Sequence, residues 1–399
     1  MVQRFLISLI ATAALITPLA AKNAAGFDQP QRAAAPSATR TGLSQFTPAA
    51  DRGDHRLDWQ HWDKALGWMV IPMGPSLRQG AARVDPTTGT RRIYGHESRL
   101  RLEGNRLAFS YLTPDIVTAL GDYRADLERI GGELDLVRLP RNEQLAFWLN
   151  LHNVALIEAL AKAYPLAEPN AAVFGPDNAP LDAAKLVKVA GIPLSLRDIR
   201  EQIVYPNWRD PKVVYGFWRG EIGGPSIQRL AFTGDNVDDL LALSGEEFVN
   251  SLRGVEAWGG ALRVSHIYEE ASPFYFKDDA ALRTHLSKFA GEDVARLLRD
   301  NDRIAFNIYE TDIADLERGE TDPNINERLV NDCKLNGCIG PNGGIFGSPP
   351  SISVNPAIAR LMRERAEKLD RARRKGVRTG MVIYGNGEYA PGSPVREVD

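Results

Sequence analysis

The chain has 399 residues, 44% of them hydrophobic, so it can bury one large core or two smaller ones. Its 48 basic and 51 acidic residues leave a formal net charge of −3. This balance creates no overall field toward nucleic acid or an anionic membrane, and nucleic-acid binding is not predicted.

Residues 1–21 have the pattern of a cleavable signal peptide. Arg4 precedes an apolar stretch at 5–19, and small alanines follow at 20–21. The alternative is an uncleaved anchor, but the stretch is shorter than the roughly 20 residues of a membrane span and Pro18 interrupts its end. We therefore predict a periplasmic or secreted protein with no transmembrane span in the mature chain.

The rest of the chain divides by composition into three parts. Residues 22–55 are rich in Ala, Pro, Ser, Thr and Gln, which predicts a flexible linker. Residues 56–318 carry periodic apolar patterns and predict one globular domain, and residues 319–399 predict an irregular C-terminal extension with a basic helix. The domain mixes helix and strand patterns, so the expected fold class is α/β or α+β.

Two amphipathic helices are predicted first. One has its apolar face at Trp59, Trp62, Leu66 and Met69. The next begins at Thr113-Pro114-Asp115, with a threonine cap and proline at the first helical position, and ends at Gly131-Gly132. Its apolar face comprises Ile116, Leu120, Tyr123, Leu127 and Ile130.

Residues 142–164 are apolar on nearly every side and predict a helix that is buried all round. Its polar residues Asn150, His152 and Asn153 then need partners inside the protein, because an unpaired buried amide costs about 1–3 kcal/mol. Two interpretations remain open: these side chains line a polar pocket, or they bind neighbouring backbone.

The following segments predict short strands and helices. Residues 186–194 indicate a strand and turn, and Ser195 to Asp198 resembles a capping box. Residues 211–218 are rich in β-branched and aromatic residues and predict a buried strand. A helix is expected from about Asn236, and Ser244 with Glu247 indicates a second capping box.

The loop at 219–226 is the strongest candidate for a ligand site, since α/β proteins place sites at the carboxyl ends of strands. Gly223 and Gly224 allow close approach of a ligand, while Arg219 and Glu221 supply charge. The alternative is a glycine turn with a surface ion pair. No metal or cofactor is predicted: no two histidines have the i, i+4 spacing, and nucleotide and hydrolase signatures are absent from the sequence.

Two features mark the C-terminal extension. Cys333 and Cys338 are the only cysteines, and in an oxidising compartment they predict a disulfide, with a redox pair as the alternative. Residues 357–375 form a basic segment whose apolar stripe either binds a protein partner or packs on the core. The stripe consists of Ile358, Met362, Ala366 and Leu369.

Several motifs resemble the DUF547 family of unknown function, found in exported bacterial proteins and in plants. The resemblance spans roughly residues 60–316. Its motifs are FWLNLHN at 147–153, GIPLSLRDI at 191–199, DPKV at 210–213, the positions Pro225, Ile227, Ala231, Phe232 and Thr233, and VSHIY at 264–268. The resemblance implies no defined reaction.

Many members of the family carry a histidine and two cysteines, which implies thiol chemistry. This sequence has Val214, Arg219 and Gly224 at those positions. A cysteine nucleophile is therefore not available at the family position.

Two functions are compatible with these residues. The prediction is a ligand-binding or scaffolding protein of the cell envelope, whose pocket of Asn150, Asn153, Arg219 and Glu221 holds a small or peptidic ligand. The alternative is a hydrolase or transferase. It would use Glu221 or His266 as the base, Ser226 or a water as the nucleophile, and the amides of Gly223 and Gly224 as oxyanion donors.

Overall fold

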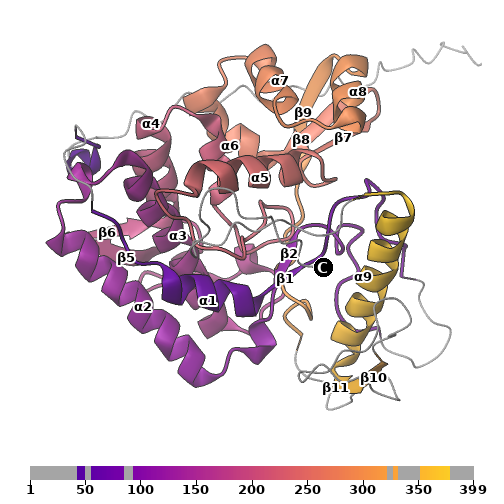
Figure 1. Ribbon diagram of the computed structural model, residues 1–399, viewed down its shortest axis with the longest axis horizontal. Helices are drawn as coiled ribbons and strands as arrows, with labels where there is room; N and C mark the ends of the chain where they lie inside the picture. The colour runs from indigo at the N-terminus through magenta and orange to yellow at the C-terminus, as the bar shows by residue number, and fades with distance from the viewer. Residues whose placement is uncertain (1–42, 50–54, 85–92, 321–326, 331–350, 378–399) are drawn as a thin grey trace, which may run out of the picture.

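The computed structural model describes residues 43–49, 55–84, 93–320, 327–330 and 351–377 (Figure 1). The helices are α1 Gln60–Met69, α2 Pro114–Glu133, α3 Arg141–Ala163, α4 Tyr205–Asn207, α5 Val237–Val249, α6 His266–Tyr275, α7 Asp279–Ser287, α8 Glu292–Asp300 and α9 Pro356–Arg374. The 3-10 turns are η1 Ser44–Phe46, η2 Phe109–Tyr111, η3 Leu136–Arg138, η4 Pro169–Ala171 and η6 Pro211–Gly216, and η5 Asp198–Val204 is a π-helical segment. The strands are β1 Val70–Pro72, β2 Asn105–Leu107, β3 Val173–Phe174, β4 Ala179–Pro180, β5 Lys185–Val189, β6 Ile192–Ser195, β7 Val255–Trp258, β8 Ala261–Ser265, β9 Arg303–Ile308, β10 Glu327–Val330 and β11 Ser351–Val354.

The strands form small separate sheets, and the class is α+β. Strands β1–β2, β3–β4, β5–β6 and β10–β11 are antiparallel pairs, while β7, β8 and β9 form a three-stranded sheet. Within that sheet β7–β8 is antiparallel and β8–β9 is parallel. The prediction of a mixed helix and strand domain is confirmed in this coarser form. No helix in the described part of the chain is both long and apolar enough to cross a bilayer.

Helix α3 is the centre of the core, as the sequence predicts. It contacts α2, α5, β5 and η5, and its side chains are buried from Glu143 through Glu158. Because apolar residues occur on every side of this helix, each neighbouring element can pack against a different face of it. The segments that carry the candidate site are held against this helix.

The two predicted amphipathic helices are present as α1 and α2. Helix α2 starts at Pro114, but it continues through both glycines to Glu133. A Cβ on Gly131 would lie 2.8 Å from Val189 and 2.9 Å from Phe147. This glycine therefore allows α2 to approach its neighbours closely and does not end the helix.

The hairpin of β5 and β6 confirms the predicted strand and turn. Its turn residues Ala190 and Gly191 have φ values of 47° and 81°, the left-handed pair that a two-residue hairpin prefers. The capping box after the hairpin is also present. The Asp198 carboxylate accepts from Ser195 N at 2.7 Å, and Ser195 Oγ accepts from Asp198 N at 3.1 Å.

Two further local predictions are wrong. Residues 211–218 are buried but form no strand, because Asp210 caps the 3-10 turn η6 by accepting from Lys212 N at 3.0 Å. Ser244 does not cap a helix, because it lies inside α5 and donates to Leu240 O at 2.6 Å. The apolar run did not distinguish a strand from a 3-10 turn at 211–218, and the spacing of Ser244 and Glu247 did not distinguish a helix start from a helix interior.

Helix α9 packs on the body of the protein beside β1 and β2 (Figure 1). Ile358 and Leu361 join a cluster with Met73 and Leu102, and Lys368 Nζ donates to Leu102 O at 2.6 Å. Of the predicted stripe, Ile358 is buried and Met362 packs against this cluster, while Ala366 is exposed. The contacts of Ile358 and Met362 support the packing interpretation over a partner site.

Several predictions lie outside the described residues. They include the signal peptide at 1–21, most of the linker at 22–55, and Cys333 with Cys338. One part of the predicted linker is described: Phe46 is buried, with its ring centroid 5.1 Å from that of Trp148. Residues 44–46 therefore belong to the packed part of the protein.

Candidate functional site

A cavity of about 230 Å³ lies beside the middle of α3. Its walls come from α3, η4, β4 and the residues after it, η5, the loop that follows η6, and the segment after β9. The lining residues are His152, Leu156, Asn170, Pro180, Leu181, Asp182, Leu196, Arg200, Trp218, Arg219, Glu221 and Tyr309. The structure therefore brings the predicted residues Arg219 and Glu221 together in one concave site.

A buried ion network forms one side of the cavity. Arg200 is fully buried; its Nη2 lies 2.7 Å from Asp182, and its Nε donates to Glu270 Oε1 at 2.9 Å. Arg219 donates to the same Glu270 oxygen at 2.7 Å. Burial by itself would raise the pKa of Glu270, but the two guanidiniums outweigh it and hold that pKa well below its usual range.

The Arg219 guanidinium is only partly used by this network. Its Nη1 lies 3.8 Å from Asp182 Oδ1, which is longer than a hydrogen bond. Its buried Nε has no hydrogen-bond partner in the described part of the protein. Arg219 therefore retains donor capacity at the cavity.

Glu221 is a predicted site residue whose proton affinity is altered by burial. It is 8% exposed, and burial raises its pKa to about 7, although a hydrogen bond from Tyr309 and the charge of Arg219 act in the opposite direction. No ion pair to Glu221 is found among the described residues. A buried carboxyl of this kind changes its charge near neutral pH.

His152 is a neutral imidazole, and both of its ring nitrogens form hydrogen bonds inside the protein. Burial lowers its pKa well below the ordinary value, and the charges of Arg200 and Arg219 lower it further. Its Nε2 faces Arg200 Nη1 at 3.2 Å, so Nε2 accepts and Nδ1–H donates to Asn153 Oδ1 at 3.1 Å. The histidine positions Arg200 and is not available as a base.

The two predicted asparagines bind backbone and do not line the cavity. Asn150 donates to Phe232 O at 2.7 Å and accepts from Phe232 N at 3.1 Å. Asn153 donates to Gly216 O at 3.0 Å and accepts from Trp218 N at 3.2 Å. These bonds satisfy buried backbone groups of Phe232, Gly216 and Trp218. The interpretation as internal bonding is the one that the geometry supports.

Ser226 and His266 do not join Glu221. Ser226 Oγ donates to Glu247 Oε2 at 3.0 Å, in a separate network. His266 has a side chain that is 52% exposed, and its Nδ1 lies 3.0 Å from Glu269. In the described structure neither residue hydrogen-bonds to Glu221.

The amides of Gly223 and Gly224 are also occupied. Gly223 N donates to Glu310 O at 2.8 Å, and Gly224 N donates to Glu221 O at 3.3 Å. They are therefore not free to stabilise an oxyanion as the alternative function requires. No cluster of three or more potential metal ligands occurs among the residues that the structure describes.

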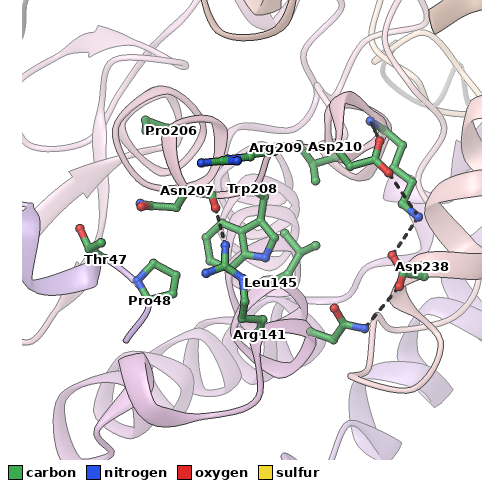
Figure 2. Close-up of a pocket in the computed structure, with 13 residues that line it drawn as sticks. Thr47, Pro48, Arg141, Leu145, Pro206, Asn207, Trp208, Arg209, Asp210 and Asp238 are labelled. Atoms are coloured by element: carbon green, nitrogen blue, oxygen red, sulfur yellow. Dashed lines mark hydrogen bonds and ion pairs between the residues drawn. The ribbon is translucent and has the colours of Figure 1, made fainter. Parts of the chain in front are cut away.

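Figure 2 shows a second cavity, of about 600 Å³, where α3 begins. The Arg141 guanidinium lies 5.4 Å from the centroid of the Trp208 ring, and Lys212 Nζ lies 2.8 Å from Asp238. The charged groups of this cavity are mostly at the surface, and its lining residues do not include Arg219 or Glu221. The smaller cavity, with its buried titratable groups, is therefore the candidate site.

Four titratable members of the site were not predicted: Asp182, Arg200, Glu270 and Tyr309. They come from separate elements, and Arg200 and Glu270 are 70 positions apart. The segment at 197–201, four charged residues around Ile199, is equally typical of a solvated helix. The sequence therefore carries no signal that would have found this network.

Comparison with known proteins identifies a family of unknown function. Residues 136–249 match the family described as "Protein of unknown function, DUF547", which confirms the resemblance drawn from the motifs. The matched region includes α3, η5, η6 and the loop with Arg219 and Glu221. No curated protein and no solved structure matches the chain.

Proposed function

We propose that this is an exported protein that binds a small polar ligand in the 230 Å³ cavity at Arg219 and Glu221. The observation that carries the proposal is that neither side chain has all the partners it could bind. Arg219 keeps N–H groups without partners, and Glu221 is a buried carboxyl without a cationic partner among the described residues. A buried donor without an acceptor is costly, and a ligand group that accepts from Arg219 would regain this free energy.

Binding is favoured over catalysis because the groups for acyl transfer are not assembled. Ser226 and His266 bond elsewhere, and the amides of Gly223 and Gly224 are engaged with backbone carbonyls. Among the residues that line this cavity, Glu221 is the one with a pKa suited to proton transfer near neutral pH. A positioned acid without a nucleophile is better suited to recognising a ligand.

The cellular location is part of the proposal and rests on the pattern of residues 1–21. Fractionation of cells that express the full chain would locate the protein, and mass spectrometry of its N-terminus would identify any cleavage. Recovery of uncleaved protein from the cytoplasmic fraction would contradict export.

Binding can be tested by isothermal titration of the full chain against small amines, carboxylates, amides and sugars. We expect saturable binding for one class, lost in both Glu221→Gln and Arg219→Gln, and retained in His266→Gln as a control on the surface. Circular dichroism would confirm that the variants fold. Absence of saturable binding, or binding unaffected by both site substitutions, would overturn the proposal.

A further inference from the structure

The carboxyls around the cavity are not equally paired. Asp182 is paired with Arg197 and Arg200, and Glu270 is paired with Arg200 and Arg219. Glu221 is the third carboxyl of the group, and the described part of the chain offers it no ion pair. When Glu221 is ionised, its charge is therefore buried without an ion pair among the described residues. A cation from the ligand would supply that partner.

A second requirement comes from Arg219, whose Nη2 is committed to Glu270 at 2.7 Å. Its Nη1 is too far from Asp182 for a hydrogen bond, at 3.8 Å, and no residue that the structure describes accepts from its Nε. A ligand oxygen is the natural acceptor for a guanidinium with free N–H groups. The ligand therefore needs a cationic group and an oxygen acceptor close to each other.

The size and lining of the cavity limit the rest of the ligand. Its volume of about 230 Å³ is below the range usual for drug-sized ligands. Leu156, Leu181 and Leu196 supply apolar surface on its walls, next to the charged groups. Such a site suits one short aliphatic group attached to a charged head.

On the basis of the proposed binding function, we infer that the ligand is an α-amino acid or the first residue of a short peptide. Its ammonium group pairs with Glu221, and its carboxylate or carbonyl oxygen accepts from Arg219. The aliphatic side chain contacts the leucines. A free amino acid and the first residue of a peptide share the group that the site would recognise, a free amine beside a carbonyl carbon.

The pairing with Glu221 links binding to pH. An ammonium ion favours the ionised carboxyl, and Glu221 in the free protein has a pKa of about 7. At pH 6 most molecules must first release this proton, whereas at pH 8 most are already ionised. The affinity for the amine should therefore be about tenfold weaker at pH 6 than at pH 8.

Isothermal titration of the full chain with four probes tests the inference: L-leucine, leucyl-glycine, leucinamide and N-acetyl-leucine. We expect the three probes with a free amine to bind and N-acetyl-leucine to bind at least about tenfold more weakly, because it lacks the cation. A preference for leucine over the dipeptide would identify a free amino acid as the ligand, and the reverse would identify a peptide.

Two variants provide the comparison. Glu221→Gln keeps the shape of the side chain and should weaken leucine binding at least about tenfold and remove its pH dependence. Glu269→Gln, an exposed carboxylate paired with His266, should leave binding unchanged. Equal binding of leucine and N-acetyl-leucine, or full binding by Glu221→Gln, would overturn the inference. If compounds without an amine occupy the cavity and these probes do not, the binding function stands and this inference fails; if nothing binds, both fail.

Discussion

Arg219 in the candidate loop donates a hydrogen bond to Glu270 Oε1 of α6 across 2.7 Å. The same oxygen accepts from Arg200 Nε at 2.9 Å and from the Tyr205 hydroxyl at 3.2 Å. One carboxylate therefore joins η5, α4, the loop and α6. The position of Arg219 at the cavity depends on this junction.

Removing the charge of Glu270 should destabilise the protein. In Glu270→Gln the buried guanidinium of Arg200 loses one of its two carboxylate partners, and an uncompensated buried charge costs about 3 kcal/mol or more. Because the Glu270 side chain is 23% exposed, we expect the free energy of unfolding to fall by about 2–3 kcal/mol. Urea unfolding followed by circular dichroism would measure it.

The neighbouring carboxylate supplies the control. Glu269 is exposed and paired only with His266 in the described structure, so Glu269→Gln should change stability by less than about 0.5 kcal/mol. Equal losses in the two variants would show that Glu270 is not the junction described above.

The raised pKa of Glu221 should make stability depend on pH. The folded protein holds this proton up to about pH 7, whereas an unfolded chain releases it near its model value of 4.5. The folded state therefore binds more protons between these values, and this group's contribution is largest below pH 4.5 and is lost as the pH rises to 7. The loss is about 3 kcal/mol by linkage.

Glu221→Gln cannot titrate and isolates this effect. We expect the stability of the wild type relative to the variant to fall by about 3 kcal/mol between pH 4.5 and 7 and then to level off. Other groups, such as His152, titrate in both proteins and cancel in the difference. A flat difference across this range in urea unfolding would contradict the assignment.

The sequence predicted the structure best where the apolar pattern of a single helix or strand is enough to identify it. The all-round apolar character of α3 predicted its burial, and the pattern at 186–194 predicted a strand and turn, which the β5–β6 hairpin confirms. Residues 211–218 were assigned wrongly because a short buried run looks alike in a strand and in a 3-10 turn. The Asp210 cap begins this turn, and the Asn153 amide binds the backbone at its end, a contact that comes from a distant part of the chain.

The candidate site was predictable only in part for the same reason. Arg219 and Glu221 are close in sequence and belong to one loop, so they could be named together. Asp182, Glu270 and Tyr309 reach the site from distant segments, and nothing in the spacing of charged residues specifies which of them meet. Pairing of this kind is a property of the folded chain.

Asn153 should contribute strongly to stability although it does not touch the cavity. In Asn153→Ala the carbonyl of Gly216 and the amide of Trp218 both lose a buried partner, and each buried unpaired group costs about 1–3 kcal/mol. We expect a loss of about 2–4 kcal/mol in urea unfolding. Asn142→Ala, at the exposed start of the same helix, should cost less than about 0.5 kcal/mol. Similar losses would mean that the Asn153 bonds are not formed.

The adjacent glycines of α2 should respond to alanine in opposite directions. A Cβ on Gly131 would lie 2.8 Å from Val189 and 2.9 Å from Phe147, both fully buried, so Gly131→Ala should destabilise the protein by about 1–3 kcal/mol. The nearest atom to a Cβ on Gly132 is 3.7 Å away, so Gly132→Ala should add about 0.5–1 kcal/mol through helix propensity. Thermal or urea unfolding of both variants would compare them. The two substitutions have the same chemistry in the same helix, so a difference in the sign of their effects on stability can arise only from the close packing of Gly131 against α3 and β5. Stabilisation by both substitutions would show that α2 does not approach these elements so closely.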